Sequence, residues 1–429
     1  MPQKIIRDPV HDVIAFQIDR PIDGLLFNLL NAAEFQRLRR ILQLGMAHLA
    51  YPGATHSRYS HSLGVMETAR QMLAHLGREI AISEDDRTVC LVSALLHDLG
   101  HGPFSHVFER VSGISHERLT QRLIQDPDSE VHRILIRHDR FLPEKIIGFL
   151  QARDGQRTFL NDVIASHLDA DRFDYLLRDN HMTGSHYGSY DLEWLLHALT
   201  VDGDGGKRLA VTWKGVSAVE DYLHARYNMY RNVYFHKVVR SAEGMVKLAL
   251  QRARRLAVQD RLEWPRRDDA VYKALLGQRL SMAEFVDLDD VAVNHCFKVW
   301  TRSDDEVLAR LCRGLLYRGL YKTVDLSHLA DGQAARAVYA RAETAVAEAG
   351  GDPAYDLFYD EPADTSYEPY ESTAPADESD AILVKQPDGR LTRFSEISSL
   401  PQALNQRLMF RRIHAAAAYR QVVANHSTA

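Results

Sequence analysis

The chain has 429 residues, a mass of 48.8 kDa and a net charge of −6 at pH 7, and 45% of its residues are hydrophobic. This apolar share excludes a disordered chain, and no stretch approaches the ~18 apolar residues of a membrane-spanning helix. Three cysteines without a Cys-x-x-Cys pair argue against a disulfide framework and a thiolate zinc site. Because the first residues also lack the apolar run of a signal peptide, we expect a soluble, cytoplasmic protein.

Helical periodicity dominates residues 1–350. Apolar residues recur at a spacing of three to four in the segments 61–80, 87–99, 142–152, 159–180, 215–237, 240–258 and 304–316. Segment 87–99 is apolar on nearly all sides, which predicts a buried central helix. Residues 208–213, after a glycine-rich turn, are the best strand candidate of this part. The sequence therefore predicts a mainly α fold.

The composition changes near Gly350. Residues 351–380 contain ten acidic residues, four prolines and no lysine or arginine, which predicts a loosely ordered connector. Segments 381–385 and 391–394 flank an Asp388-Gly389 pair, a pattern typical of a β-hairpin, and a last helix is expected at about 401–422. We thus predict a helical core at 1–350, the acidic connector at 351–380, and at 381–429 a small α+β appendage that packs on the core.

The strongest chemical signal lies at residues 95–106, where an apolar helix runs into Leu-Leu-His97-Asp98-Leu-Gly-His101-Gly-Pro-Phe-Ser-His106. Polar side chains that end a buried helix are costly unless they are paired or bind a metal. Imidazole and carboxylate together suit a divalent first-row metal. One helix cannot surround an ion, so we expect further ligands from His61 and Asp171, which lie in unusually polar segments.

A structural role is the alternative for each of these side chains. A single buried histidine is more often a hydrogen-bonded core residue than a ligand, and Gly100 and Gly102 can form a helix C-cap. The joint occurrence of His61, the His97-Asp98 pair and Asp171 favours the metal site.

The pattern His61 … His97-Asp98 … Asp171 resembles the H…HD…D signature of the HD-domain phosphohydrolases. Longer blocks are similar to those of the deoxynucleoside triphosphate triphosphohydrolases, a family with a mammalian member that carries a sterile-alpha-motif domain and bacterial members that lack it. The blocks lie in order over about residues 1–325: IRDPVH at 6–11, FQRLR at 35–39, QLG at 43–45, YPGATHSR at 51–58, HSLG at 61–64, LHDLGHGPFSH at 96–106, DADRFDY at 169–175 and YFHK at 234–237.

This resemblance implies an HD-domain helical core that cleaves a dNTP between the 5′ oxygen and the α-phosphorus, which yields a deoxynucleoside and intact triphosphate. One divalent metal (Fe, Mn, Ni, Zn or Mg) would be held by His61, His97, Asp98 and Asp171, and additional Mg²⁺ would accompany the nucleotide. Proton transfer to the departing oxygen needs a group that titrates near neutrality. The matching active-site positions are His101, His106 and His116, with Glu117 as an orienting partner; we favour His106 or His116 as the acid.

The resemblance also implies a substrate pocket with cations for the polyphosphate. Arg58, Arg172 and Lys237 match phosphate-contacting positions, Arg226 is a weaker candidate, and Arg172 stands where relatives often have lysine. Gln43, Tyr175 and Asp179 match positions near the sugar 3′ hydroxyl. Tyr234 matches a tyrosine that fills the space of a ribose 2′ hydroxyl, so a bias for deoxy substrates is expected.

Relatives can be activated by nucleotides bound at subunit interfaces, so we expect a homo-oligomer, either a dimer or a tetramer. The matching positions of this second site are Lys4, Gln36, Arg39, Lys214, Arg318 and Lys322, for which ordinary surface charge is an equally good interpretation. Asn31 replaces an aspartate that reads guanine in the mammalian enzyme, and Thr212 replaces an arginine. These two departures argue against guanine-specific activation.

Two other function classes compete with this hypothesis. A nucleotidase, or a phosphodiesterase or nuclease, could use the same metal site without the phosphate cations named above. A nucleic-acid-binding protein could use the patch Arg252, Arg254, Arg255, Arg261, Arg266 and Arg267. Acidic residues interrupt this patch and it has little aromatic content beyond Trp264, so a solvated face is the better interpretation.

Overall fold

The computed structural model describes residues 3–152, 157–202, 208–364, 381–404 and 408–427, and it is mainly helical, as predicted. The first helices are α1 (Pro21–Leu30), α2 (Ala33–Arg37), α3 (Arg58–Leu76), α4 (Glu84–Leu96), α5 (His106–Ser112), α6 (His116–Gln125), α7 (Glu130–His138), α8 (Leu142–Leu150), α9 (Phe159–Asp162), α10 (Ala170–Thr183) and α11 (Leu192–Ala198). The later helices are α12 (Val216–Met229), α13 (Lys237–Val258), α14 (Ala270–Leu275), α15 (Met282–Val286), α16 (Asp290–Trp300), α17 (Glu306–Leu316), α18 (Gly332–Glu348), α19 (Pro353–Asp356), α20 (Phe394–Ile397), α21 (Leu400–Leu404) and α22 (Arg420–Asn425). Among the described residues, none of these helices has both the length and the apolar content to cross a membrane.

Short helical turns and small sheets complete the chain. The turns are η1 (Leu38–Arg40), η2 (Gly45–Leu49), η3 (Trp213–Gly215), the π-turn η4 (Tyr230–Tyr234) and η6 (Ala417–Tyr419). Strands β1 (Gln3–Asp8) and β2 (Asp12–Gln17) form an antiparallel hairpin, and β7 (Ala363–Asp364) pairs with β10 (Leu408–Met409). A three-stranded sheet has the order β5 (Lys322–Asp325), β11 (Arg412–Ala415), β6 (Leu357–Asp360), and a four-stranded sheet has the order β3 (Leu199–Val201), β4 (Leu209–Thr212), β8 (Leu383–Lys385), β9 (Leu391–Arg393).

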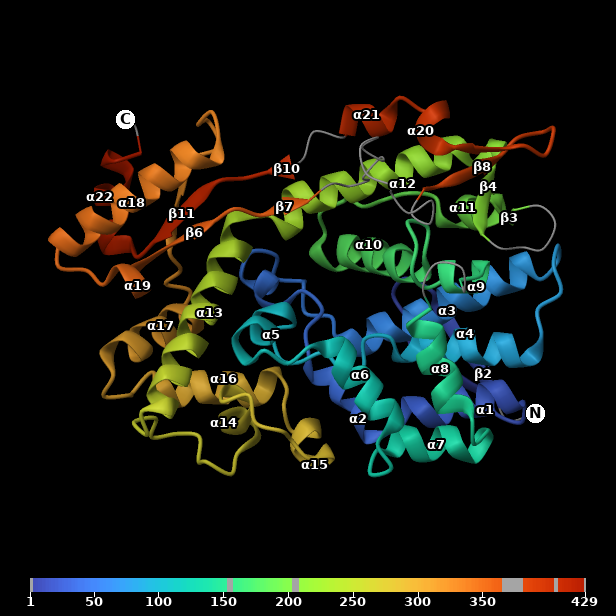
Figure 1. The fold of residues 1–429 in the computed structure, drawn as a ribbon, viewed down its shortest axis with the longest axis horizontal. Helices are drawn as coiled ribbons and strands as arrows, with labels where there is room; N and C mark the ends of the chain where they lie inside the picture. The colour runs from blue at the N-terminus through green and yellow to red at the C-terminus, as the bar shows by residue number, and fades with distance from the viewer. Residues whose placement is uncertain (1–2, 153–156, 203–207, 365–380, 405–407, 428–429) are drawn as a thin grey trace.

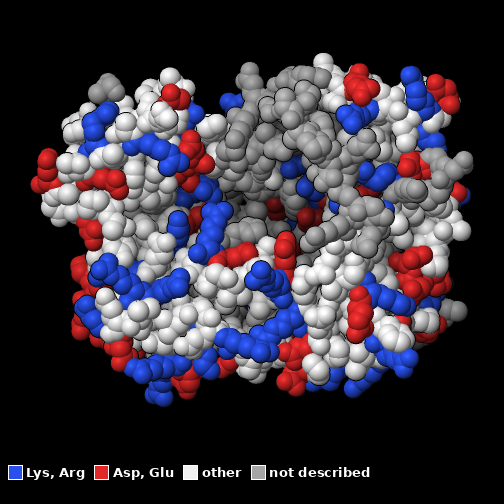
Figure 2. Space-filling view, viewed as in Figure 1, with Lys and Arg blue, Asp and Glu red and all other residues white. Residues whose placement is uncertain are grey.

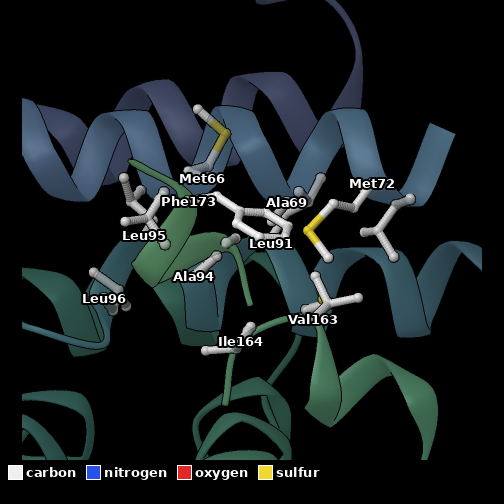
Figure 3. Close-up of a cluster of buried hydrophobic side chains, with 14 of the residues drawn as sticks. Met66, Ala69, Met72, Leu91, Ala94, Leu95, Leu96, Val163, Ile164 and Phe173 are labelled. Atoms are coloured by element: carbon white, nitrogen blue, oxygen red, sulfur yellow. The ribbon is translucent and has the colours of Figure 1, made fainter. Parts of the chain in front are cut away.

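The main hydrophobic core lies between α3, α4 and α10. Figure 3 shows Phe173 of α10 among Met66 and Met72 of α3 and Leu91 of α4, and all four side chains are buried. Helix α4 is buried from Thr88 to Leu96, as its apolar sequence predicts, so its C-terminal end delivers the next two residues, His97 and Asp98, to the interior. This packing fixes the three helices that carry the metal-site motif.

The segments predicted as helices are mostly confirmed, with one break. Residues 159–180 form two helices, α9 and α10, because Asp169 caps the second one: its Oδ1 accepts the N–H of Arg172 at 2.7 Å and its Oδ2 accepts the N–H of Ser166 at 3.0 Å. An aspartate directly before the first residue of a helix is a typical N-cap signal, and the prediction of one continuous helix missed it.

The C-terminal region differs most from the prediction. The hairpin of β8 and β9 is confirmed, and its turn uses Gly389 at φ +86°. The helix predicted at 401–422 is wrong, because this stretch contains α21, β10 and β11 instead. Within the predicted connector, residues 353–364 form α19, β6 and β7, and residues 365–380 lie outside the described part of the chain.

The C-terminal strands also pair with strands of the preceding chain. β11 lies between β5 and β6, and β8 runs parallel to β4. In Figure 1 the sheet of β6 and β11 lies with α18 and α22 at the upper left, and the long helix α13 passes between this region and the helices that carry the metal-site motif.

Candidate metal centre and substrate cavity

Three of the four predicted metal ligands form one compact cluster. His61 lies near the start of α3, His97 follows the last residue of α4, and Asp171 lies in the first turn of α10. Their ligand atoms lie within 4.8 Å of one another, and Oδ1 of Asp171 is 2.9 Å from Nε2 of His61 and 3.6 Å from Nε2 of His97. Nε2 of His97 is buried without a hydrogen-bond partner, although Nδ1 of the same ring contacts the carbonyl of Ala94 at 2.8 Å. The donor set of two imidazoles and a carboxylate fits a divalent metal, and Nε2 of His97 faces two carboxylates within 3.6 Å without a hydrogen bond to either.

The fourth predicted ligand, Asp98, borders this cluster. Its Oδ1 is 3.5 Å from Nε2 of His97, and its Oδ2 is 3.9 Å from Nε2 of His61. The same carboxylate accepts a hydrogen bond from Arg58 and lies 3.2 Å from Nε2 of His101. Burial alone would raise the pKa of Asp98, but His97, the contact with His101 and the Arg58 guanidinium hold it well below its usual range. Asp98 therefore connects the metal cluster to Arg58.

A second layer of side chains orients His61. Nδ1 of His61 is 2.9 Å from Oδ2 of Asp174, and Arg178 donates two hydrogen bonds, of 2.9 and 2.8 Å, to this aspartate. His11 contacts the other oxygen of Asp174 at 2.9 Å, and Asp8 accepts a hydrogen bond of 2.8 Å from Arg178. Burial disfavours a charged imidazole, but the carboxylates on its two nitrogens raise the pKa of His61 to about 10. An outer carboxylate of this kind fixes which ring nitrogen faces the metal.

The side chains of this second layer had no predicted role. His11 and Asp8 lie in the block at 6–11, and Asp174 lies in the block at 169–175, so both blocks contained a signal. A second signal is Gly64, one helical turn after His61. A Cβ at Gly64 would lie 1.9 Å from Oδ1 of Asp174 and 2.3 Å from a guanidinium nitrogen of Arg178. Only a glycine lets α3 approach this ion pair so closely.

Two of the predicted catalytic histidines stack beside Asp98. The rings of His101 and His116 lie 4.0 Å apart with an interplanar angle of 14°. Burial and the nearby Arg58 guanidinium lower the pKa of His101 to about 3. Gly100 allows this arrangement, because a Cβ there would lie 2.1 Å from the carbonyl oxygen of His116. The close approach of α6, rather than a helix C-cap, explains this glycine.

The predicted partner of His116 is replaced by another glutamate. Nδ1 of His116 contacts Oε2 of Glu109 at 2.9 Å, whereas Glu117 is exposed on α6. Glu109 lies on α5, the helix that begins at His106. The side chain of His106 lies outside the described part of the structure, so its catalytic role stays a prediction.

A cavity of about 330 Å³ opens next to the metal cluster. Five of the predicted substrate residues line it: Gln43, Arg58, Tyr175, Asp179 and Tyr234. The hydroxyl of Tyr234 donates to Oδ2 of Asp179 at 2.7 Å, and Nε2 of His56 contacts the other oxygen at 2.7 Å. The face drawn in Figure 2 is hollowed near its middle, between the elements labelled α5, α10 and α13 in Figure 1, and acidic and basic side chains surround the hollow.

The other predicted phosphate contacts lie outside the lining of this cavity. Arg172 is turned back to the start of its own helix, where it donates to Asp169 and to the carbonyl of Ser166. Arg226 lies 5.5 Å from the centre of the Tyr230 ring, is 6% exposed, and its Nε and Nη1 have no hydrogen-bond partner. Lys237 is exposed at the start of α13 and lines a different cavity.

That second cavity, of about 270 Å³, joins Lys237 to two residues of the predicted regulatory site. Arg318 and Lys322 line it together with Arg420, and no carboxylate is among its lining residues. Gln36 and Arg39 of the same predicted site contact each other elsewhere, with Nε of Arg39 donating to Oε1 of Gln36 at 2.8 Å. The remaining two residues, Lys4 and Lys214, lie on β1 and η3.

Several side chains of the arginine-rich patch make contacts within the protein. Arg252 makes two hydrogen bonds to Asp305, Arg254 donates to the carbonyl of Val111 at 2.7 Å, and Arg267 pairs with Asp260. These contacts favour the interpretation of this patch as an ordinary charged surface.

Comparisons with known proteins agree with this site. The HD-domain model matches residues 58–175, and the model of the HD-associated region matches residues 190–279. The chain belongs to the HD-domain phosphohydrolases. The HD-domain match begins at Arg58 and ends at Tyr175, so it contains all four predicted metal ligands, and an HD domain implies a divalent metal site.

Relatives of this HD-domain protein include chains with and without an assigned activity. It is 34% identical over 407 residues to YwfO of Bacillus subtilis, described as uncharacterised, and the match covers 94% of this chain and 89% of that protein. It is 30% identical over 284 residues to the human deoxynucleoside triphosphate triphosphohydrolase SAMHD1, covering 58% of this chain and 44% of the human enzyme. A phosphohydrolase crystal structure from Bacteroides thetaiotaomicron superposes with a TM-score of 0.81 at 28% identity, covering 96% of this chain and 100% of that one.

Proposed function

We propose that this HD-domain protein is a metal-dependent dNTP triphosphohydrolase that releases a deoxynucleoside and intact triphosphate. The observation that carries the proposal is the position of the cavity. Arg58 binds the metal-site residue Asp98 and lines the cavity, and Tyr175 also lines it while its ring lies 6.5 Å from that of His61. A divalent metal at His61, His97 and Asp171 would polarise the α-phosphate or activate water. The dNTP triphosphohydrolase activity of human SAMHD1, to which this chain is 30% identical over 284 residues, supports the choice of dNTP.

The sugar would bind at Asp179 and Gln43. Asp179 is 1% exposed and held by His56 and Tyr234, so its carboxylate has a fixed position from which to accept a hydrogen bond from the 3′ hydroxyl. Oε1 of Gln43 is buried in the cavity wall without a hydrogen-bond partner, which makes it a second acceptor for a ligand hydroxyl. The ring of Tyr234, which packs 6.3 Å from that of Tyr175, would exclude a 2′ hydroxyl.

The triphosphate would be bound by Arg58, which lines the cavity, and by Arg226, which lies against the lining residue Tyr230. Arg226 supports this, because two of its buried guanidinium nitrogens, Nε and Nη1, have no hydrogen-bond partner, which is costly, and a phosphate would satisfy them. His116 would donate the proton to the departing 5′ oxygen while Glu109 orients its ring, with His106 as the other candidate acid. The nucleotidase and phosphodiesterase alternatives need no cluster of cations beyond the metal.

The test is product analysis with Mn²⁺ or Mg²⁺. The purified protein is incubated with each dNTP alone and with all four together, and the products are separated by ion-exchange chromatography. We expect deoxynucleoside and intact triphosphate in equal amounts. Release of monophosphate, pyrophosphate or single phosphate would contradict the proposed bond cleavage, and the ribonucleotide GTP should be a much poorer substrate than dGTP.

We further propose that the cavity of Lys237, Arg318, Lys322 and Arg420 binds a regulatory nucleotide through its phosphates. Four basic side chains around one hollow without a lining carboxylate favour a polyanion. Lys322→Glu should remove any activation by mixed dNTPs and leave the basal activity, whereas Lys298→Glu, at an exposed lysine of α16, should change neither. Equal activation of the wild-type protein and Lys322→Glu would contradict this regulatory site.

A further inference from the structure

A buried aspartate outside the HD motif connects the two loops that border the substrate cavity. Asp290 is the first residue of α16 and is 4% exposed. Its Oδ1 accepts the N–H of Phe104 at 2.8 Å, and its Oδ2 accepts the N–H of Leu42 at 2.8 Å. The helix itself is capped by the preceding residue, Asp289, whose Oδ1 accepts the N–H of Ala292 at 2.9 Å. The Asp290 carboxylate is therefore not needed as the helix cap and instead binds two distant loops.

The first of these loops has an unfavourable backbone conformation. Phe104 and Ser105 have φ values of +50° and +53°, and neither is glycine. Two consecutive residues in this region persist only where the surroundings hold them. The hydrogen bond from the N–H of Phe104 to Asp290 supplies such a restraint at the start of the strained pair.

The strained loop acts directly on the metal site. Oγ of Ser105 accepts two hydrogen bonds from Arg58, from Nε at 3.1 Å and from Nη2 at 2.8 Å. The remaining guanidinium nitrogen of Arg58, Nη1, donates to Asp98. The position of Ser105 therefore determines where Arg58 points, and Arg58 both lines the cavity and binds a predicted metal ligand.

The second loop contributes Gln43 to the cavity wall and lies beside the segment that carries Arg58, whose N–H donates to the carbonyl of Ile41 at 2.9 Å. Leu42, whose N–H is bound by Asp290, precedes Gln43, which lines the cavity and donates its own N–H to the carbonyl of His56 at 3.0 Å. A separate contact ties the chain before α16 to the HD loop: buried Arg37 donates to the carbonyl of Leu288 at 2.8 Å and to that of His101 at 2.7 Å. The start of α16 is thus joined to both loops by contacts of two different side chains.

We propose that Asp290 is a positioning residue of the active site, which uses one carboxylate oxygen for each loop and so holds the Phe104–Ser105 loop, and through Ser105 the Arg58 side chain, against the segment that carries Gln43. This inference rests on the proposed function for its kinetic readout only. An asparagine retains one acceptor oxygen and turns an NH₂ group toward a backbone N–H, so it releases one of the two loops.

The test compares Asp290→Asn with Asp289→Asn. The control residue, Asp289, precedes Asp290 in the chain and is also 4% exposed. Its carboxylate pairs with the side chain of Arg40 and caps α16, and it holds neither the N–H of Leu42 nor that of Phe104. We expect Asp290→Asn to lower kcat by about 10- to 100-fold, with a smaller change in KM, and to weaken Mn²⁺ binding at a melting temperature close to that of the control. Wild-type kcat and Mn²⁺ affinity in Asp290→Asn would overturn the proposal.

Amide hydrogen exchange of the wild-type protein gives a second measurement that needs neither a variant nor a substrate. The amides of Leu42 and Phe104 should exchange more slowly than that of Gly102, because a buried carboxylate holds both. Exchange as fast as at Gly102 would overturn the proposal even where Asp290→Asn folds poorly. Since Mn²⁺ binding and amide exchange do not depend on dNTP cleavage, a wild-type protein that cleaves no dNTP would refute the proposed function and leave the role of Asp290 to be decided by these two measurements.

Discussion

His61, His97 and Asp171 come from three helices and still bring their ligand atoms within 4.8 Å, whereas the C-terminal strands carry no local sign of the strands they pair with. The two regions differ in how their contacts are encoded. In the metal cluster, a polar side chain interrupts an apolar helix, and that interruption is visible in the sequence. In the sheet of β5, β11 and β6, β11 pairs with β5 across 87 to 93 positions of the sequence and with β6 across 52 to 58, and each strand has only four residues.

The first prediction breaks the metal cluster itself. Asp171→Ala removes the carboxylate that lies between His61 and His97, so hydrolysis should fall by more than about 10³-fold and Mn²⁺ binding should be lost. The melting temperature should change little, because the Asp171 side chain is 33% exposed. Substantial activity of a metal-depleted Asp171→Ala protein would contradict the metal mechanism.

The second prediction concerns the layer behind the cluster. Gly64→Ala would place a Cβ 1.9 Å from Asp174, and we expect it to destabilise the protein by about 3 kcal/mol and to weaken Mn²⁺ binding. Gly148→Ala is the matched control, because it lies on an exposed face of α8 with no atom within 4 Å of the added Cβ. The same free energy of unfolding for Gly64→Ala and Gly148→Ala in chemical denaturation would contradict the role of Gly64.

These residues show how far the sequence predicted the site. The ordered motifs identified His61, His97 and Asp171, and the helical periodicity identified α3, α4 and α13. Roles that depend on close approach between helices were missed: Gly64 looks like any small helical residue until Asp174 lies against it. Lys237 was predicted beside the substrate, but the break between η4 and α13 turns it to the other cavity.

The third prediction tests the C-terminal sheet, where the sequence failed. Burial alone would raise the pKa of Asp360, but the ring of His414, 3.7 Å away, and hydrogen bonds from Arg240 lower it to about 2. Because the folded pKa lies below the unfolded value of 3.8, the stabilisation is present above pH 4 and is lost as the pH falls toward 2. Asp360→Asn should therefore cost about 2 kcal/mol at pH 7, and its difference from the wild-type protein should shrink between pH 4 and 2 in denaturant titrations. A difference that does not change with pH would show that the ion pair is not its cause.

The fourth prediction separates two glutamates near His116. Glu109→Gln should lower kcat by about tenfold, because Oε2 of Glu109 contacts Nδ1 of His116 at 2.9 Å. Glu117→Gln, on the exposed face of α6, should behave as the wild-type protein. A lower kcat for Glu117→Gln than for Glu109→Gln would instead support Glu117 as the partner of His116, as predicted from the sequence.

The central claim is that the bond between the 5′ oxygen and the α-phosphorus is cleaved with water attacking phosphorus at the metal cluster. Hydrolysis of dGTP in H₂¹⁸O with Mn²⁺, followed by mass spectrometry of both products, tests it most directly. The account predicts one ¹⁸O atom in the triphosphate and none in the deoxyguanosine. Label in the deoxyguanosine, or label in pyrophosphate or single phosphate in place of triphosphate, would contradict it.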